Sequence, residues 1–194
     1  NFKEAQKLVN ENKYNKAILN GISYMNDIKK EFGQIYDEYI ESIYRFIYIK
    51  VNSKDVAEDL TSETFTRAWK AFSKSKSSGV PIENMRAFCY RTARNIVIDY
   101  YKSRATNSVP LDSVQVIDES VDIEKRAMIN SDMDIVMQGI AKLKDEYQDV
   151  IIWRYLDELS VPEISELLGK SEQATRVMIH RAMTSLKNYL SKQV

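Results

Sequence analysis

Polar and basic side chains near the end of the chain have the types and spacing needed to contact DNA. Residues 159–183, "LSVPEISELLGKSEQATRVMIHRAM", show two helical patterns on either side of Gly169. In the second pattern, one face holds Gln173, Arg176, His180, Thr184 and Lys187. The opposite face holds Thr175, Ile179, Ala182 and Leu186. A basic outer face beside a short turn favours a helix that binds the major groove, whereas the alternative is a solvated helix in a bundle.

A second basic segment, residues 86–104, interleaves arginines with aromatic residues. Helical projection places Cys89, Ala93, Ile96 and Tyr100 inward. Arg91, Asn95 and Lys102 lie roughly opposite, with Arg94 to one side. Cations that follow phosphates beside rings that stack on bases suit single-stranded or distorted nucleic acid. The alternative, that aromatic residues at helical spacing form a core, is the more common one for such a segment alone.

The residues available for catalysis or metal binding are few. His180 is the only histidine and Cys89 the only cysteine, so neither a cysteine zinc cluster nor an internal disulfide is expected. Cys89 is predicted to be a small buried hydrophobe. The lack of an E-x-x-H pair disfavours a helical carboxylate-bridged metalloenzyme. We therefore predict no catalytic residue, no metal site and no cofactor.

The composition indicates a helical globular protein. The 194 residues are 44% hydrophobic and 29% charged, with five glycines and three prolines. The net charge is zero but patterned: residues 86–104 and 170–192 are basic, and residues 105–134 are acidic. No run approaches the roughly 18 apolar residues of a membrane span, and no cleavable signal is visible. We expect a cytoplasmic protein with no membrane insertion.

The elements that must position these residues can be outlined from periodicity and capping signals. We predict helices at 35–51, 55–72, 83–104, 132–143 and 145–159, and a polar loop at 73–81. Ser160 and Glu163 fit a capping box, Gly169 fits a left-handed helix stop, and Ser171 fits a cap of the last helix. Residues 2–30 are expected to be helical, without an assignable chemistry.

Four stretches, in order, resemble the extracytoplasmic function (ECF, group IV) sigma factors of bacteria. "YDEYIESIYRFIYIKV" resembles the opening helix of sigma domain 2, and "DVAEDLTSETFTRAWKAF" follows the pattern of its polymerase-binding helix. "MRAFCYRTARNIVIDYYKSR" resembles the helix that binds the −10 element. "LKDEYQDVIIWRYLDELSVPEISELLGKSEQATRVMIHRAMTSLKNYL" resembles domain 4. The resemblance covers about residues 35–190, and the ordered set is more specific than any one motif.

The resemblance implies an all-α fold with two small helical domains joined by an extended linker. The implied divisions are an N-terminal helical extension at 1–34, domain 2 at 35–104, an acidic linker at 105–127 and domain 4 at 128–194. Fully extended, the linker could reach at most about 75 Å, which spans roughly 20 base pairs. Two DNA-binding units on one promoter are therefore geometrically feasible.

The resemblance also implies partners and site residues. RNA polymerase core, through its β′ clamp helices and β flap, promoter DNA and an anti-sigma factor are the partners usual for this family. The implied polymerase-binding residues are Asp55, Glu58, Asp59, Glu63, Phe65, Arg67 and Trp69. The implied −10 residues are Arg86, Phe88, Arg91, Arg94, Asn95 and Lys102, beside a base-accepting loop at 73–84. The implied −35 residues are Lys170, Ser171, Gln173, Arg176, Val177, His180 and Arg181.

Several positions depart from the family pattern. Ser62 replaces a usual glutamine, Phe88 replaces a common tryptophan, and Met178 and Met183 stand where relatives often carry arginine. Fewer phosphate contacts are therefore expected from the last helix. The main competing interpretation is a transcription regulator whose N-terminal helices dimerise or sense a ligand. Such a protein would bind a palindromic duplex tightly without polymerase, whereas a sigma factor would need the core enzyme.

Overall fold

The protein is helical throughout the part of the chain that the structure describes. The structure is a computed structural model that describes the backbone of residues 2–107 and 131–192, and the side chains of residues 21–104 and 135–192. The helices are α1 (Phe2–Val51), α2 (Lys54–Ser78), α3 (Met85–Asn107), α4 (Ser131–Ala141), α5 (Asp145–Ile151), the π-helical η2 (Ile152–Leu156), α6 (Val161–Leu168) and α7 (Glu172–Leu190). No strand occurs within these ranges, and the predicted all-α class is confirmed.

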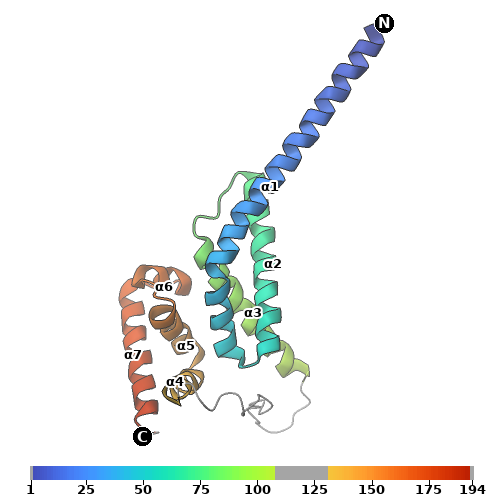
Figure 1. Cartoon of the computed structure of the whole chain (residues 1–194). Helices are drawn as coiled ribbons and strands as arrows, with labels where there is room; N and C mark the ends of the chain where they lie inside the picture. The colour runs from blue at the N-terminus through green and yellow to red at the C-terminus, as the bar shows by residue number, and fades with distance from the viewer. Residues whose placement is uncertain (1, 108–130, 193–194) are drawn as a thin grey trace.

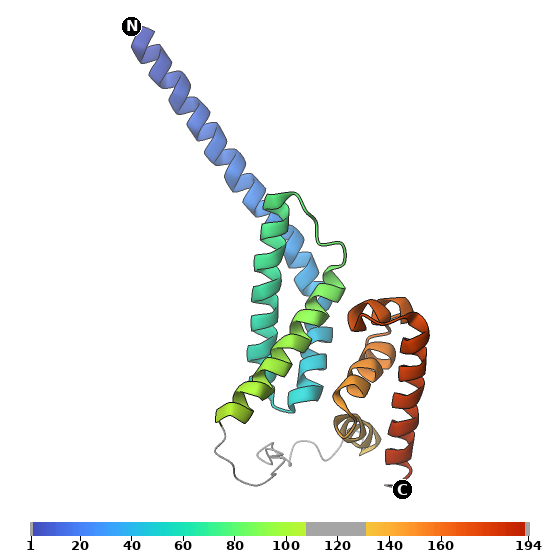
Figure 2. The same cartoon turned by 180° about the vertical axis from the view of Figure 1, so that it is seen from behind.

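Helices α1, α2 and α3 pack together as the first unit, residues 21–104 (Figures 1 and 2). The helix predicted over residues 2–30 is confirmed, and it is continuous with the one predicted at 35–51: α1 runs unbroken from Phe2 to Val51. Its N-terminal half extends away from the rest of the molecule, as Figure 1 shows. No described helix is long and apolar enough to cross a membrane.

The end of α2 differs from our prediction of a loop at 73–81. The helix continues to Ser78, where Gly79 stops it in a left-handed conformation with φ 73°. The serines that suggested a loop bond to the helix itself: the Ser75 hydroxyl donates to the Phe72 carbonyl, and that of Ser78 to the Ser75 carbonyl. The loop is therefore residues 79–84. Likewise α3 extends to Asn107, three residues into the predicted linker, whose remainder lies outside the described residues.

Helices α4 to α7, with η2, form the second unit, residues 131–192. The segment 145–159 was predicted as one helix but changes from α5 to π-helical η2, followed by Glu158 at φ 55°. The predicted capping box between Ser160 and Glu163 is confirmed, as is the left-handed Gly169 at φ 62°. The Ser171 cap is also confirmed, because its hydroxyl accepts a hydrogen bond from the Ala174 amide. All four inner residues predicted for the last helix are buried.

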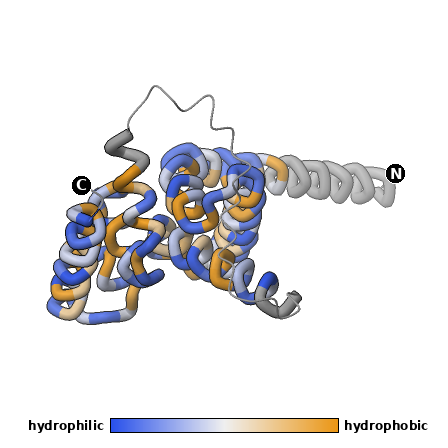
Figure 3. Tube along the Cα trace, turned by 90° about the horizontal axis from the view of Figure 1, so that it is seen from below, coloured by the Kyte–Doolittle hydropathy of each residue, from blue (hydrophilic) through white to orange (hydrophobic). Residues whose placement is uncertain are grey.

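A shared hydrophobic core joins the two units. Phe46 of α1 stacks on Trp153 of η2, with ring centroids 5.8 Å apart, and the Tyr90 ring of α3 meets both edge-on. All three side chains are fully buried. In the view of Figure 3, the two units lie against one another. The sequence predicted two helical domains and an extended linker, and it gave no sign of this association.

Candidate nucleic-acid interface

Three arginines of α3, Arg86, Arg91 and Arg94, each pair with an acid of the second unit. Arg94 Nε donates to Asp149 Oδ2 at 2.7 Å, and Lys50 Nζ of α1 donates to Asp149 Oδ1 at 2.6 Å. The Asp149 side chain is only 1% exposed, and that of Lys50 only 5%. A buried carboxylate without cationic partners would be strongly destabilised, so Asp149 depends on the first unit for its charge balance.

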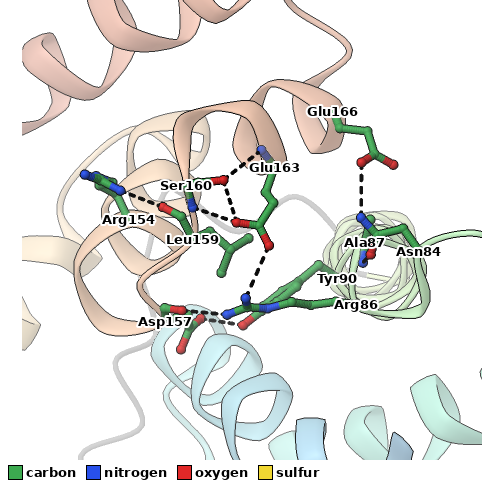
Figure 4. A network of polar contacts seen from close by, with 10 residues as sticks. All are labelled: Asn84, Arg86, Ala87, Tyr90, Arg154, Asp157, Leu159, Ser160, Glu163 and Glu166. Atoms are coloured by element: carbon green, nitrogen blue, oxygen red, sulfur yellow. Dashed lines mark hydrogen bonds and ion pairs between the residues drawn. The ribbon is translucent and has the colours of Figure 1, made fainter.

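Asp157 makes a second cross-unit contact, and Figure 4 shows the part of it that involves Tyr90 and Arg86. Its carboxylate accepts hydrogen bonds from the Arg45 guanidinium and, at 2.7 Å, from the Tyr90 hydroxyl. Its backbone carbonyl accepts from Arg86 Nη2 at 2.6 Å. Burial and the Asp157 carboxylate raise the pKa of the Tyr90 hydroxyl, which therefore remains a donor.

Glu163 links the local start of α6 to this interface. Its carboxylate accepts from the Ser160 hydroxyl at 2.6 Å and the Ser160 amide at 2.8 Å, and it pairs with Arg86 at 3.3 Å. These hydrogen bonds and the nearby guanidinium lower the pKa of Glu163. Glu163, the third helical residue of the α6 capping box, thus also holds Arg86 of α3, as Figure 4 shows.

The other residues predicted for the −10 element lie at the margin of the same interface or outside it. Arg91 Nη2 pairs with Glu166 at 2.9 Å, and Asn84 Nδ2 donates to Glu166 at 3.1 Å. Asn95 and Lys102 are exposed, whereas Phe88 is half-buried against the core. Cys89 is a buried hydrophobe as predicted, and burial raises the pKa of its thiol to about 12.

The predicted −35 residues gather on the outer face of α7 and the turn before it. All seven are exposed: Lys170, Ser171, Gln173, Arg176, Val177, His180 and Arg181. Five of them line a cleft with Glu146 and Tyr147 of α5. Arg176 pairs with Glu172 of the same helix at 2.7 Å. No ion pair joins this face to the first unit within the described residues, so its polar groups point to solvent.

The residues predicted to bind polymerase are distributed along α2. Asp55, Glu58, Asp59 and Glu63 are exposed, as is Arg67, which pairs with Glu63. Phe65 instead is 5% exposed and meets Tyr36 edge-on at 4.8 Å, so it lies in the packing beneath this surface. Trp69 is half-buried and borders an apolar groove between α1 and α2, lined also by Phe32, Tyr36, Ile40 and Tyr44.

Sequence reasoning missed the acids of the second unit and the aromatic residues of α1. Asp149, Asp157 and Glu166 follow no motif of their own, and their partners lie 55 to 112 residues away. Glu163 was assigned only to the capping box. Periodicity identifies the buried face of a helix, but it cannot indicate which distant cation meets an acid on that face.

Both units match families of known proteins. The family "Sigma-70 region 2" matches residues 35–106, and "Sigma-70, region 4" matches residues 133–186. The ECF RNA polymerase sigma factor BldN of Streptomyces coelicolor is 32% identical over 164 residues, which cover 82% of this chain. This chain spans only 60% of the length of BldN. The ECF RNA polymerase sigma factor SigW of Bacillus subtilis is 28% identical, and the match covers 82% of this chain and 88% of SigW.

The fold is shared with a solved sigma factor. The sigma factor RpoE of Bartonella quintana, in complex with the anti-sigma factor NepR, superposes with a TM-score of 0.64. The identity is 19%, and the match covers 84% of this chain and 98% of that one. At this identity the likeness concerns the fold alone.

Proposed function

The chain belongs to the sigma-70 family, among its ECF sigma factors, and we propose that it directs RNA polymerase core to specific promoters. In this function it would be a subunit of the polymerase and not an enzyme itself. The first unit would hold the melted −10 strand, and the second unit would bind the −35 duplex. We assign these two roles because region 2 and region 4 have them in the family.

The observation that carries the proposal is the presence of two separate basic helical faces in one chain. One face lies on α3, with Arg86, Arg91 and Arg94. The other lies on α7, whose outer residues are exposed. They coincide with the parts of the chain that match regions 2 and 4. A regulator with one DNA-binding unit would need only the second face.

For the −10 strand, α3 offers cations and aromatic rings on the same helix. Arg91 and Arg94 would contact phosphates, and Phe88, Asn95 and Lys102 would lie along the strand. A base extruded from the duplex costs a few kcal/mol of stacking, which must be recovered by contacts on the protein. Since α2 continues to Ser78, the loop that would accept the base is limited to residues 79–84.

For the −35 duplex, α7 offers an exposed N-terminal half. Ser171 caps the helix, and Gln173, Arg176 and Val177 follow within its first two turns. Gln and Arg can form bidentate hydrogen bonds to adenine and guanine, and the Val177 methyl groups suit a thymine methyl. Lys170 and Arg181 would contact phosphates from either side, because both line the cleft at the start of α7.

For polymerase, the exposed acids of α2 and the neighbouring apolar groove form a mixed surface. Asp55, Glu58, Asp59 and Glu63 would select a basic partner surface, and Trp69 would supply apolar contact area. By resemblance to the family, that partner is the β′ clamp, and region 4 would bind the β flap. An anti-sigma partner and membership of group IV are further proposals from the same resemblance.

The test is to mix the full chain with purified core RNA polymerase. We expect a stable complex on size-exclusion chromatography and run-off transcripts from a subset of genomic promoter fragments. Asp59→Lys should weaken the complex at least about tenfold. The matched control Asp99→Lys introduces the same charge change at an exposed acid of α3 and should leave core binding unchanged.

Two outcomes would count against the proposal. Failure of the wild-type chain to associate with core polymerase would reject the sigma-factor function. Tight binding of a palindromic duplex by the free protein, with no gain on adding core, would instead support the competing transcription regulator.

A further inference from the structure

The end of α2 is held by a part of α1 that lies before the match to sigma-70 region 2, which begins at residue 35. The Tyr24 hydroxyl donates to the Lys76 backbone carbonyl at 3.1 Å. In a longer helix this carbonyl would bond to residue 80, which lies beyond the end of α2. Lys76 Nζ also pairs with Glu31 Oε1 at 2.6 Å. Residues 24–32 of α1 thus supply polar partners to the last turn of α2 (Figures 1 and 2).

Apolar side chains in residues 24–32 pack near the same end of α2. The ring centroid of Phe32 lies 5.2 Å from that of Trp69 and 5.6 Å from that of Phe72. Ile28 lies one turn before Phe32 and is only 3% exposed. Phe72 is likewise buried, at 4% exposed. The helical end of α2 is therefore joined to α1 by buried apolar contacts as well as by polar ones.

The sequence at the end of α2 does not favour a helix by itself. Residues 73–78 read SKSKSS, and Gly79 follows directly. Serine is a weaker helix former than alanine, because its hydroxyl competes for nearby backbone groups. This composition predicts a loop that begins at residue 73, whereas α2 continues to Ser78. Since tertiary packing supplies most of the stability of helices in proteins, the contacts with α1 account for the helical state of residues 73–78.

The contacts with α1 also fix where the loop 79–84 begins. At its start, Gly79 leaves α2 in a left-handed conformation at φ 73°. At its end, the Asn84 side-chain oxygen accepts a hydrogen bond from the Ala87 amide at 2.9 Å, which caps the start of α3. Between these ends Val80 is 69% exposed. A short loop with both ends fixed is preorganised, and preorganised contacts are what selective binding of one extruded base requires.

We propose that residues 24–32 of α1 position the −10 contact: they keep residues 73–78 helical and thereby set where the base-accepting loop 79–84 begins. This inference rests on the proposed function, since it concerns the loop that we assign to the extruded base. The residues act through α2 and not by contact with DNA. Without them the loop lengthens toward residue 73, and the discrimination between bases falls.

The first test compares Ile28→Ala with Ile22→Ala, each as the full chain assembled with core RNA polymerase. The probe is a promoter fragment that gave a run-off transcript, with a duplex −35 element and an unpaired −10 strand. Each position of that strand carries each of the four bases in turn. The wild type should prefer one base at the extruded position by about tenfold, and Ile28→Ala should reduce this preference to about twofold. Ile22→Ala is the matched control, because Ile22 is 54% exposed on the same helix and should leave the preference unchanged.

Hydrogen exchange of the same proteins tests the cause of the change. The amides of residues 75–78 should lose protection in Ile28→Ala and keep it in Ile22→Ala. A merely structural role of Ile28 would lower this protection and leave the base preference as it is in the wild type. The proposal requires both changes together in Ile28→Ala, so either change alone, or neither, would overturn it.

A second test does not depend on how Ile28→Ala folds. The double variant Tyr24→Phe, Glu31→Gln removes the two polar contacts to Lys76 at positions that are about half exposed. It should lower the base preference by about twofold or more, because each lost contact favours unwinding of the α2 end. Ser77→Ala, added to the double variant, raises the helix propensity of that end and should restore the preference. Wild-type preference in the double variant, or no recovery with Ser77→Ala, would contradict an action through α2.

The same assay separates this inference from the proposed function. If the wild-type holoenzyme binds the fragment but prefers no base at any −10 position, the assignment of the loop 79–84 to an extruded base fails, and the positioning role fails with it. If the wild type prefers one base and Ile28→Ala prefers it equally, only the positioning role of residues 24–32 fails.

Discussion

The basic faces of α3 and α7 resemble each other in sequence and differ in what surrounds them. Arg86, Arg91 and Arg94 of α3 are each bound to an acid of the other unit. On α7, Arg176 pairs only with Glu172 one turn earlier, and its neighbours on the outer face are exposed. The three α3 arginines are therefore bound to acids of the other unit, whereas the basic residues of α7 are exposed to solvent.

The difference shows that two helices with similar basic residues can differ in whether those cations are held by acids of another part of the chain. The basic residues on the outer face of α7 are exposed to solvent. The charge on α3 is balanced by Asp149, Glu163 and Glu166, which a DNA strand on this face would have to displace. The chain of zero net charge therefore carries one basic face that its own acids neutralise and one that is exposed.

The largest expected effect is on the free energy of unfolding, when a buried ion pair is removed instead of an exposed one. Asp149→Ala leaves Lys50 buried without its acid, and should lower the free energy of unfolding by up to about 3 kcal/mol. Glu172→Ala removes the exposed pair on α7 and should cost about 0.3–0.5 kcal/mol. Urea unfolding followed by circular dichroism measures both. Similar losses would mean that the two faces do not differ in the way described.

The next effect tests which face binds duplex DNA. Arg176→Ala should weaken the binding of holoenzyme to a promoter fragment by about 1–3 kcal/mol, because a base or phosphate contact is lost. Arg91→Ala should affect promoter opening instead, measured by permanganate reactivity of unpaired thymines. Core binding should be unchanged in both variants. Loss of core binding in Arg176→Ala would show that its role has been misassigned.

Helix caps give a third comparison of the two faces. Ser171→Ala and Ser160→Ala should each lower stability by about 1 kcal/mol, because each hydroxyl accepts a backbone amide at a helix start. Only Ser160→Ala also removes a bond to Glu163, which holds Arg86. It should therefore increase the affinity of the free chain for single-stranded DNA, whereas Ser171→Ala should not. A similar gain in both variants would contradict this distinction.

The smallest expected effect is on the free energy of unfolding at acid pH. The pKa of Glu163 is lowered by its bonds to Ser160 and by Arg86, so its ionised form stabilises the folded state. This stabilisation is fully present above the pKa that Glu163 has in the unfolded chain, and it is lost as the pH falls through the lower folded-state value. Glu163→Gln should therefore flatten the fall in unfolding free energy at acid pH. An unchanged slope would contradict the link between the capping box and the interface.

Much of the fold and of the α7 face could be predicted from the sequence because the determining interactions are local. Ser160, Glu163, Gly169 and Ser171 act on backbone groups within a few residues of themselves, and all four occupy the predicted positions. The buried face of α7 follows from periodicity alone. The end of α2 was misjudged because serines favour loops on average, whereas Ser75 and Ser78 bond to carbonyls one turn back.

What the sequence determined by itself was therefore the set of helices, their caps and the two basic segments. Only the tertiary structure decided that the α3 arginines face Asp149, Glu163 and Glu166, and that Trp153 stacks on Phe46. Helical periodicity depends on neighbours three or four residues apart, whereas these contacts join residues 55 to 107 positions apart in the chain. Their partners are selected by the docking of two whole units, for which no short stretch of sequence carries a signal.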